Sequence, residues 1–295
     1  MLAIAFLLGL VVNPVAADAS SLEPPPPLEG GVLPAAWAVL KSDCVSRPPF
    51  RSHEYNPTFI IIRQSGCTNY EKPFLYLLVG TDEALLLDTG ATGANLRPTV
   101  DALMQGRVTS GGGPLPLLVL HSHGHGDHVA GDGVLSTRPG TRIIPAQAAA
   151  IAQFFDLRWP TGTASYDLGS RMIDIVPIPG HEAAHIAVYD RRTGVLLTGD
   201  TLYPGRLYVS AQQTFRDSVD RLVDFTSSRP IAHVFGGHIE QKRTPYVDYP
   251  IGTTQQPEEH VLELGRAHLL ELQDALRQMP GPMVRTYLRD FTVWP

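Results

Sequence analysis

The chain of 295 residues has two cysteines, Cys44 and Cys67, and no Cys-x-x-Cys pair. This scarcity argues against a cysteine-based zinc site. The chain also lacks a Gly-x-Ser-x-Gly sequence, which argues against the serine nucleophile of an α/β-hydrolase. In an oxidising compartment the two cysteines can form one disulfide between the N-terminal segment and the first strand region; two unpaired buried thiols are the alternative.

Basic residues are in the minority. Lys and Arg number 23 against 29 Asp and Glu, which gives a formal net charge of −6. This balance does not favour a polyanionic substrate, although a local basic patch is compatible with it. We therefore expect a small-molecule substrate and no nucleic-acid partner. The sequence has no internal repeat and leaves the oligomeric state open.

The first 17 residues contain no charged side chain. The apolar run from Leu2 to Val12 is too short to span a bilayer comfortably, and Val15 and Ala17 stand at the −3 and −1 positions of a cleavage site after Ala17. The pattern predicts a signal peptide over residues 1–17 without the usual basic start; an uncleaved anchor or a different start site is the alternative. We expect a periplasmic or secreted protein with no stable membrane insertion after cleavage.

The proline run from Pro24 to Pro27 cannot form a helix or a central strand. We therefore interpret residues 18–54 as a Pro-rich linker and N-terminal extension. Residues 55–295 are long enough for one large domain with its own core, and we expect it to end in a C-terminal helix.

Apolar and β-branched runs separated by glycine-containing turns predict mixed α and β structure. Strands are expected at residues 59–62, 74–79, 84–87, 117–120, 142–144, 172–176, 186–189, 195–198 and 231–235. Helices are expected at residues 93–107 and 146–155, from a capping box at Thr214–Asp217, and from Pro257 onward.

The most informative stretch is residues 120–129, where an apolar strand gives way to histidines, an aspartate and small residues. His123 and His125 are two positions apart, so in an extended backbone their side chains project to the same side and can share one ion. Asp127 and His128 point elsewhere and are available to a second ion. A polar loop that is rich in histidine by chance is the alternative.

Three later segments each place one ligand-type residue after an apolar segment and a glycine: His181, Asp200 and His238. Together with residues 121–128 and with Asp88 in Leu85–Gly90, this ordered set resembles the metallo-β-lactamase-fold hydrolases over roughly residues 55–240. The resemblance implies an α/β fold, a four-layer αβ/βα sandwich. It also implies one metal held by His123, His125 and His181, another held by Asp127, His128 and His238, and Asp200 bridging both.

The resemblance also favours one branch of the family. True β-lactamases carry cysteine or serine where Asp200 stands, so the glyoxalase II-like or lactonase-like branch fits better. Oxygen-reducing di-iron relatives generally carry a carboxylate where His125 stands, so the resemblance disfavours a redox role. Asp88 is expected to hydrogen-bond loop backbone, His185 and His121 to support the site, and His260 and His268 to lie at the surface or an interface.

The expected protein is an exported binuclear metallohydrolase with two Zn, although Mn or Fe is compatible with the same ligands. In it, a hydroxide held between the metals attacks a small ester, lactone or thioester. Asp127 would also orient this nucleophile, and Tyr203 would donate a hydrogen bond to the substrate unless it is a packed aromatic. The alternatives are an iron-dependent oxidoreductase, a catalytically idle metal-binding protein, a phosphodiesterase and a β-lactam hydrolase.

Overall fold

The structure is a computed structural model that describes residues 27–37, 44 and 46–295. The predicted signal peptide and residues 18–26, 38–43 and 45 of the predicted linker and extension lie outside the described residues. Within the described part, no helix is both long enough and apolar enough to cross a membrane.

The first sheet has six strands in sequence order. They are β1 (Phe50–Asn56), β2 (Phe59–Gln64), β3 (Phe74–Val79), β4 (Ala84–Leu87), β5 (Leu117–Leu120) and β6 (Thr141–Ile143). The first four pair antiparallel, whereas β5 and β6 join in parallel. All residues of β2 to β5 are buried, because both faces of these apolar strands are covered.

The second sheet has five strands in the order β12-β10-β9-β8-β7. They are β7 (Ala164–Asp167), β8 (Met172–Pro177), β9 (Ile186–Asp190), β10 (Val195–Gly199) and β12 (His233–Gly236). The expected strands β9 and β10 form an antiparallel hairpin, and β12 lies parallel to β10.

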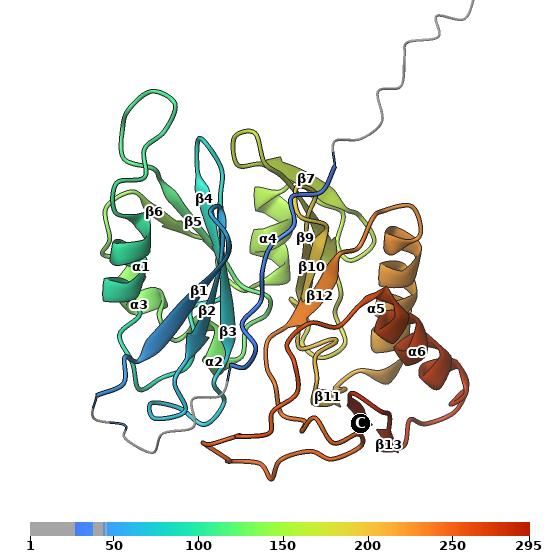
Figure 1. Cartoon of the computed structure of the whole chain (residues 1–295). Helices are drawn as coiled ribbons and strands as arrows, with labels where there is room; N and C mark the ends of the chain where they lie inside the picture. Colours follow the sequence, from blue (N-terminus) through green and yellow to red (C-terminus); the bar gives the residue numbers. More distant parts are fainter. Residues whose placement is uncertain (1–26, 38–43, 45) are drawn as a thin grey trace, which may run out of the picture.

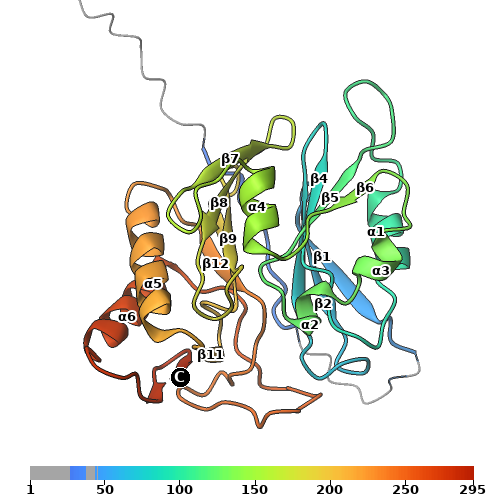
Figure 2. The same ribbon diagram turned by 180° about the vertical axis from the view of Figure 1, so that it is seen from behind.

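The two sheets pack face to face, with helices on both outer sides (Figures 1 and 2). The core between the sheets includes Phe59 and Ile61 from the first sheet and Val188 and Leu197 from the second. Helices α1 (Arg97–Met104) and α3 (Asp132–Leu135) lie outside the first sheet, and α5 (Gln212–Thr226) and α6 (Arg266–Arg277) outside the second. The short helix α4 (Ala148–Phe154) contributes Ile151 to the core between the sheets. The predicted four-layer αβ/βα sandwich is confirmed.

Several element boundaries differ from those predicted. Helix α5 begins at Gln212 with Ala211 as its N-cap, so Thr214 lies inside the first turn and the predicted capping box is wrong. Helix α6 begins at Arg266, nine residues after the predicted start at Pro257, because the backbone around Leu264 forms a bridge with Val234 of β12 before the helix begins. Helix α1 is shorter than predicted, since it ends at Met104 and begins only at Arg97.

Two parts of the architecture were not predicted. Strand β1 begins at Phe50, so the first sheet starts within the segment that the sequence suggested was an extension. A third, three-stranded sheet joins β11 (Arg206–Tyr208), β13 (Thr286–Tyr287) and β14 (Thr292–Trp294), and it ties the C-terminus to the segment after β10.

Candidate metal centre

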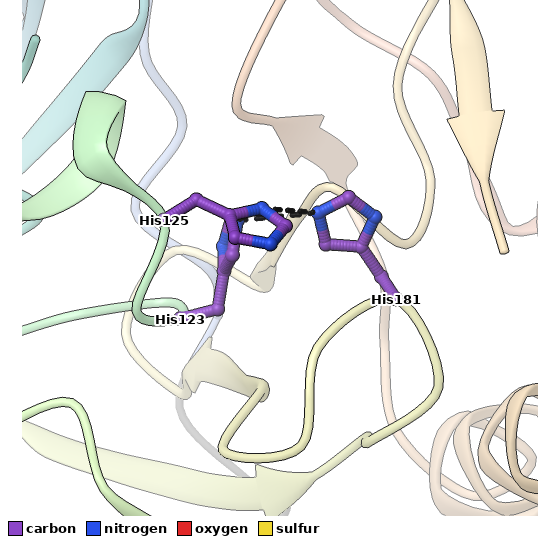
Figure 3. A group of neighbouring side chains, drawn as sticks. All are labelled: His123, His125 and His181. Atoms are coloured by element: carbon purple, nitrogen blue, oxygen red, sulfur yellow. Dashed lines mark hydrogen bonds between the residues drawn. The ribbon is translucent and has the colours of Figure 1, made fainter. Parts of the chain in front are cut away.

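The loop after β5 delivers the first group of histidines. His123 is fully buried, and His125 is an exposed, extended residue that precedes the one-turn helix α2 (Gly126–Val129). His181 comes from the turn after β8. Figure 3 shows these three imidazoles converging from two separate loops.

The nitrogen atoms of this group lie close together. His125 Nδ1 is 2.9 Å from His123 Nε2 and 3.0 Å from His181 Nε2. The Nε2 atoms of His123 and His181 are 3.2 Å apart. Ligands placed 2.0–2.1 Å from a tetrahedral zinc ion are separated by about 3.3 Å, so the three nitrogens have the spacing of one ion's ligands. We call this group the first trio.

Asp127, His128 and His238 form the second trio. His238 Nε2 lies 3.3 Å from Asp127 Oδ2 and 3.3 Å from His128 Nε2, and the distance between Asp127 Oδ2 and His128 Nε2 is 3.5 Å. Asp127 and His128 follow His125 on the one-turn helix α2 and group with His238, and the ring centroid of His128 lies 4.1 Å from that of His123. Both trios have the donor types and spacing of a metal site.

Asp200 lies between the two trios. Its Oδ2 is 3.6 Å from His181 Nε2 and 4.0 Å from His123 Nε2. Its Oδ1 is 3.6 Å from His128 Nε2 and 3.5 Å from His238 Nε2. This Oδ1 is buried and accepts no hydrogen bond from the residues that the structure describes. A buried carboxylate oxygen without a partner is costly, so the donor set fits cations on both sides of Asp200.

In three of these histidines, the Nδ1 atom, which faces away from the centre, contacts an oxygen atom of the protein. His181 Nδ1 donates to the carbonyl oxygen of Tyr208 at 2.8 Å, and His238 Nδ1 donates to that of Glu71 at 3.0 Å. His128 Nδ1 lies 2.9 Å from Asp88 Oδ2. Each contact holds a proton on Nδ1 and turns Nε2 towards the centre, which is the ring orientation of metal-binding histidines.

Other residues predicted to support the site do so. Asp88 Oδ1 accepts a hydrogen bond from the backbone N–H of Ser122 at 2.6 Å, which confirms its expected role. His185 is buried beside Asp200 and receives the Asp200 N–H on Nε2 at 3.3 Å. His121, which the sequence suggests is structural, contacts Asp132 Oδ1 at 2.8 Å.

Two histidines that were expected at the surface or an interface, His260 and His268, are partly exposed. His260 and His268 both contact the carboxylate of Asp290, at 3.1 Å and 3.2 Å.

Electrostatics favour the ligand forms of His123, Asp127 and Asp200, whereas the carboxylates of Asp88 and Asp200 outweigh burial and raise the pKa of His128 to about 10. Burial lowers the pKa of His123 well below its ordinary value, so its imidazole is neutral and able to bind a cation. Burial would raise the pKa of Asp200, but His238 and His128 hold it well below its usual range. Burial likewise opposes ionisation of Asp127, whereas His238 and His128 lower its pKa to about 2. Both carboxylates are therefore anionic at neutral pH.

Tyr203 does not have the predicted role of a hydrogen-bond donor to the substrate. Its side chain is 1% exposed, and its hydroxyl donates to the carbonyl oxygen of Arg206 while lying 3.2 Å from Glu240 Oε2. The ring packs edge-on against His238, with 5.6 Å between the ring centroids. Tyr203 is thus the packed aromatic that the sequence left as its alternative.

The chain matches the model of the metallo-beta-lactamase superfamily over residues 72–238. This match covers more than half of the chain and contains every residue of both trios. The protein belongs to the metallo-beta-lactamase superfamily. The family resemblance and the fold expected from the sequence are thereby confirmed.

The matched curated relatives are of the glyoxalase II type. The chain is 30% identical over 141 residues to a hydroxyacylglutathione hydrolase of Chelativorans sp., covering 46% of this chain and 54% of the relative. It is 31% identical over 143 residues to a hydroxyacylglutathione hydrolase of Anaeromyxobacter dehalogenans, covering 48% of this chain and 49% of the relative. The chain therefore spans about half the length of these relatives.

Solved structures share the fold of this superfamily member. A metallo-beta-lactamase from Pontibacter korlensis has a TM-score of 0.53 and 14% identity, covering 78% of this chain and 100% of that one. A metallo beta lactamase from Hirschia baltica has a TM-score of 0.50 and 14% identity, covering 65% of this chain and 91% of that one.

Sequence reasoning missed the residues that shape the space beside the centre. A cavity of about 180 Å³ is lined by Tyr70, Glu71, Tyr208 and Glu240, among others. Two of these residues, Glu71 and Tyr208, supply the carbonyl oxygens that hold His238 and His181. No sequence signal marks them, because their contribution comes from the backbone and depends on the fold.

Proposed function

We propose that the protein is an exported, binuclear metal-dependent hydrolase of a small ester, lactone or thioester. The observation that carries the proposal is the position of Asp200, whose two carboxylate oxygens each face a different trio. One carboxylate shared in this way suits two ions at a short, fixed separation.

A pair of divalent ions, which we propose to be zinc, supplies a water activated as a nucleophile at neutral pH and a Lewis acid for the oxygen of the substrate. The chain's own residues set the approach to it. His123, His128, His181 and His238 are buried, whereas His125 is exposed and Asp127 is partly exposed. Substrate therefore reaches the centre from the side of His125 and Asp127, where the Asp127 carboxylate can accept a hydrogen bond from the attacking water.

The thioester is the first class to test. The matched relatives are named hydroxyacylglutathione hydrolases, and their name describes the cleavage of an acyl group from glutathione. The β-lactamases among the solved structures share the fold at 14% identity, which carries no argument about substrate.

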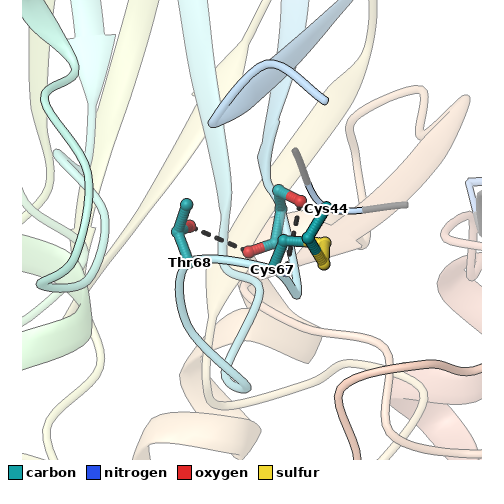
Figure 4. The surroundings of a disulfide bond; sticks show 4 residues. Cys44, Cys67 and Thr68 are labelled. Atoms are coloured by element: carbon teal, nitrogen blue, oxygen red, sulfur yellow. Dashed lines mark hydrogen bonds between the residues drawn. A yellow bond between two sulfur atoms is a disulfide. The ribbon is translucent and has the colours of Figure 1, made fainter. Parts of the chain in front are cut away.

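One contact among the described residues supports export. Cys44 and Cys67 form a disulfide, as the sequence allows (Figure 4). Disulfides persist mainly in oxidising compartments, so this pair supports a periplasmic or secreted location.

The test measures metal and turnover on the same preparations. The bound metals are quantified by mass spectrometry, and proton release is followed in a pH-stat with a thioester, a lactone, an ester, a phosphodiester and a β-lactam. Two zinc ions per chain and a chelator-sensitive rate on a thioester, lactone or ester support the proposal. Three results would contradict the proposal: a chelator-sensitive rate on only the phosphodiester or the β-lactam, bound iron with oxygen consumption, or bound metal without any turnover.

A further inference from the structure

A second cavity, of about 160 Å³, adjoins the cavity that Glu71 and Tyr208 line. Lys72 and Gln256 line both cavities and form the boundary between them. The remaining walls include Trp37, Arg47 and Arg63. None of the seven metal-site residues lines this second cavity, which we call the arginine cavity.

The arginine cavity carries an excess of positive charge. Four basic side chains line it, those of Arg47, Arg51, Arg63 and Lys72, against the single carboxylate of Glu259. That carboxylate is already bound by Arg63 in a two-pronged contact, at 2.6 Å and 2.8 Å. Among the described residues, no carboxylate pairs with Arg47 or Arg51. Arg51 also stands directly opposite Arg63 in the β1–β2 register, an arrangement of like charges that is unfavourable without an anion nearby.

Polar atoms around the arginine cavity lack partners. Arg63 and Gln256 are 6% and 7% exposed, yet Arg63 Nε and Gln256 Oε1 make no hydrogen bond with the described part of the chain. The same holds for Arg47 Nη2, which is also buried. Unpaired buried polar atoms are costly, and a ligand would supply the missing partners. The amide of Gln256 can present either its oxygen or its nitrogen, so it suits a ligand oxygen as well.

Two apolar side chains, Trp37 and Pro48, also line the arginine cavity. Trp37 is 4% exposed and packs edge-on against Phe74, with ring centroids 5.1 Å apart. Pro48 adds a second apolar surface. The disulfide of Cys44 and Cys67 holds the wall near Arg47 against the turn after β2 (Figure 4).

We propose that the arginine cavity binds a small organic acid. The acid group lies against Arg47 and Arg63, and the apolar body packs on Trp37 and Pro48. An apolar cavity of about 150 Å³ accommodates benzene, so the volume suits an acid with a single ring or an equivalent short chain. This site does not depend on the hydrolase activity proposed above, because its walls are separate from the metal ligands.

Benzoate is the probe, and the full protein is titrated by isothermal calorimetry both metal-loaded and chelated. We expect one benzoate per chain with the same affinity in both forms, because the arginine cavity does not use the metals. Benzamide, which has the same shape without the charge, should bind at least about 10-fold more weakly, since hydrogen bonds to charged groups are the stronger ones. Inorganic phosphate, which lacks the ring, should also bind more weakly than benzoate.

Variants locate the binding. Arg47→Met should weaken benzoate binding at least about 10-fold, and Arg47→Lys should restore part of it, since the charge returns. Gln256→Glu is nearly the same shape, and should weaken benzoate more than benzamide because it places a carboxylate beside the acid group. The control Arg277→Met removes an exposed arginine of α6 and should change nothing.

Three results would overturn the proposal: no saturable benzoate binding, equal affinity for benzamide, or unchanged affinity in a folded Arg47→Met protein. Benzoate binding that disappears on chelation would also overturn it, since the acid would then be at the metal centre. A failed hydrolase assay with intact benzoate binding would contradict only the proposed function.

Discussion

Gly237 lies so close to Asp200 that a β-carbon on residue 237 would be 2.4 Å from Asp200 Oδ1. The same β-carbon would be 3.0 Å from His128 Cε1. A β-carbon does not approach a carboxylate oxygen to 2.4 Å, so the absence of a side chain at Gly237 is what allows Asp200 to sit between the trios. The glycine that precedes His238 in the sequence is thus part of the geometry of the centre.

Gly237→Ala should displace the Asp200 carboxylate and lower both metal occupancy and turnover. A displacement near 1 Å in such a site costs on the order of 100-fold in rate. Metal content per chain and the rate on the best substrate measure the effect, with circular dichroism to verify folding. Gly133→Ala is the matched control, because a β-carbon there meets no atom within 4 Å. Full metal content and a normal rate in Gly237→Ala would show that Asp200 does not need its present position.

Asp88 controls a different part of the centre, the orientation of His128. Replacing it by Asn keeps the shape but removes the charge beside His128 Nδ1, at 2.9 Å. Because such supporting carboxylates typically contribute 10- to 100-fold in metal affinity, Asp88→Asn should lose about that much. Competition with a chromogenic chelator measures it. The exposed Asp101→Asn serves as control, and equal affinities in the two variants would contradict the role of Asp88.

The sequence could single out the residues that the fold brings together in the two trios and Asp200, because each follows an apolar strand or lies in one compact motif. His181, Asp200 and His238 come from separate segments, yet each follows a glycine after an apolar run, and the ends of neighbouring strands meet at one edge of the sandwich. The backbone oxygens of Glu71 and Tyr208 could not be predicted, because any residue type supplies a carbonyl.

The helix and strand errors have a common physical origin. The predicted start of α6 at Pro257 rests on local helix signals, but the chain up to Leu264 makes bridges to distant segments instead. Strand β14 pairs with β11 across more than 80 residues, a contact that short-range patterns do not encode. For Tyr203, closeness to Asp200 in the sequence suggested a substrate contact, whereas the fold directs its hydroxyl to Arg206.

The disulfide should contribute measurably to stability. It joins residues 23 positions apart, and closing a loop of this length in the unfolded chain corresponds to about 3 kcal/mol. The double variant Cys44→Ser/Cys67→Ser should therefore have a free energy of unfolding lower by about that amount, as measured by urea denaturation. Titration of denatured, unreduced protein from an oxidising compartment should find no free thiol. Two free thiols, or equal stability of the double variant, would contradict the prediction.

Lys72 should make the stability of the protein rise with pH above neutrality. Burial, reinforced by the charge of Arg63, lowers the pKa of Lys72 from 10.5 to about 8, although its ammonium donates to the carbonyl oxygens of Tyr70 and Thr253. Below pH 8 Lys72 is charged in both states, and its burial penalty is fully present. Between pH 8 and 10.5 the unfolded chain binds more protons than the native protein, so the free energy of unfolding rises with pH.

The gain from Lys72 over this range is on the order of 3 kcal/mol, because each pKa unit corresponds to about 1.4 kcal/mol. Urea unfolding of the wild type and of Lys72→Met at pH 7.5, 9 and 10 isolates it, since other groups titrate equally in both proteins. The stability of the wild type relative to Lys72→Met should increase with pH. Lys242→Met, which removes a lysine paired with the exposed Glu258, is the control and should show a constant difference. A constant difference for Lys72→Met as well would mean that Lys72 titrates alike in the folded and unfolded chain.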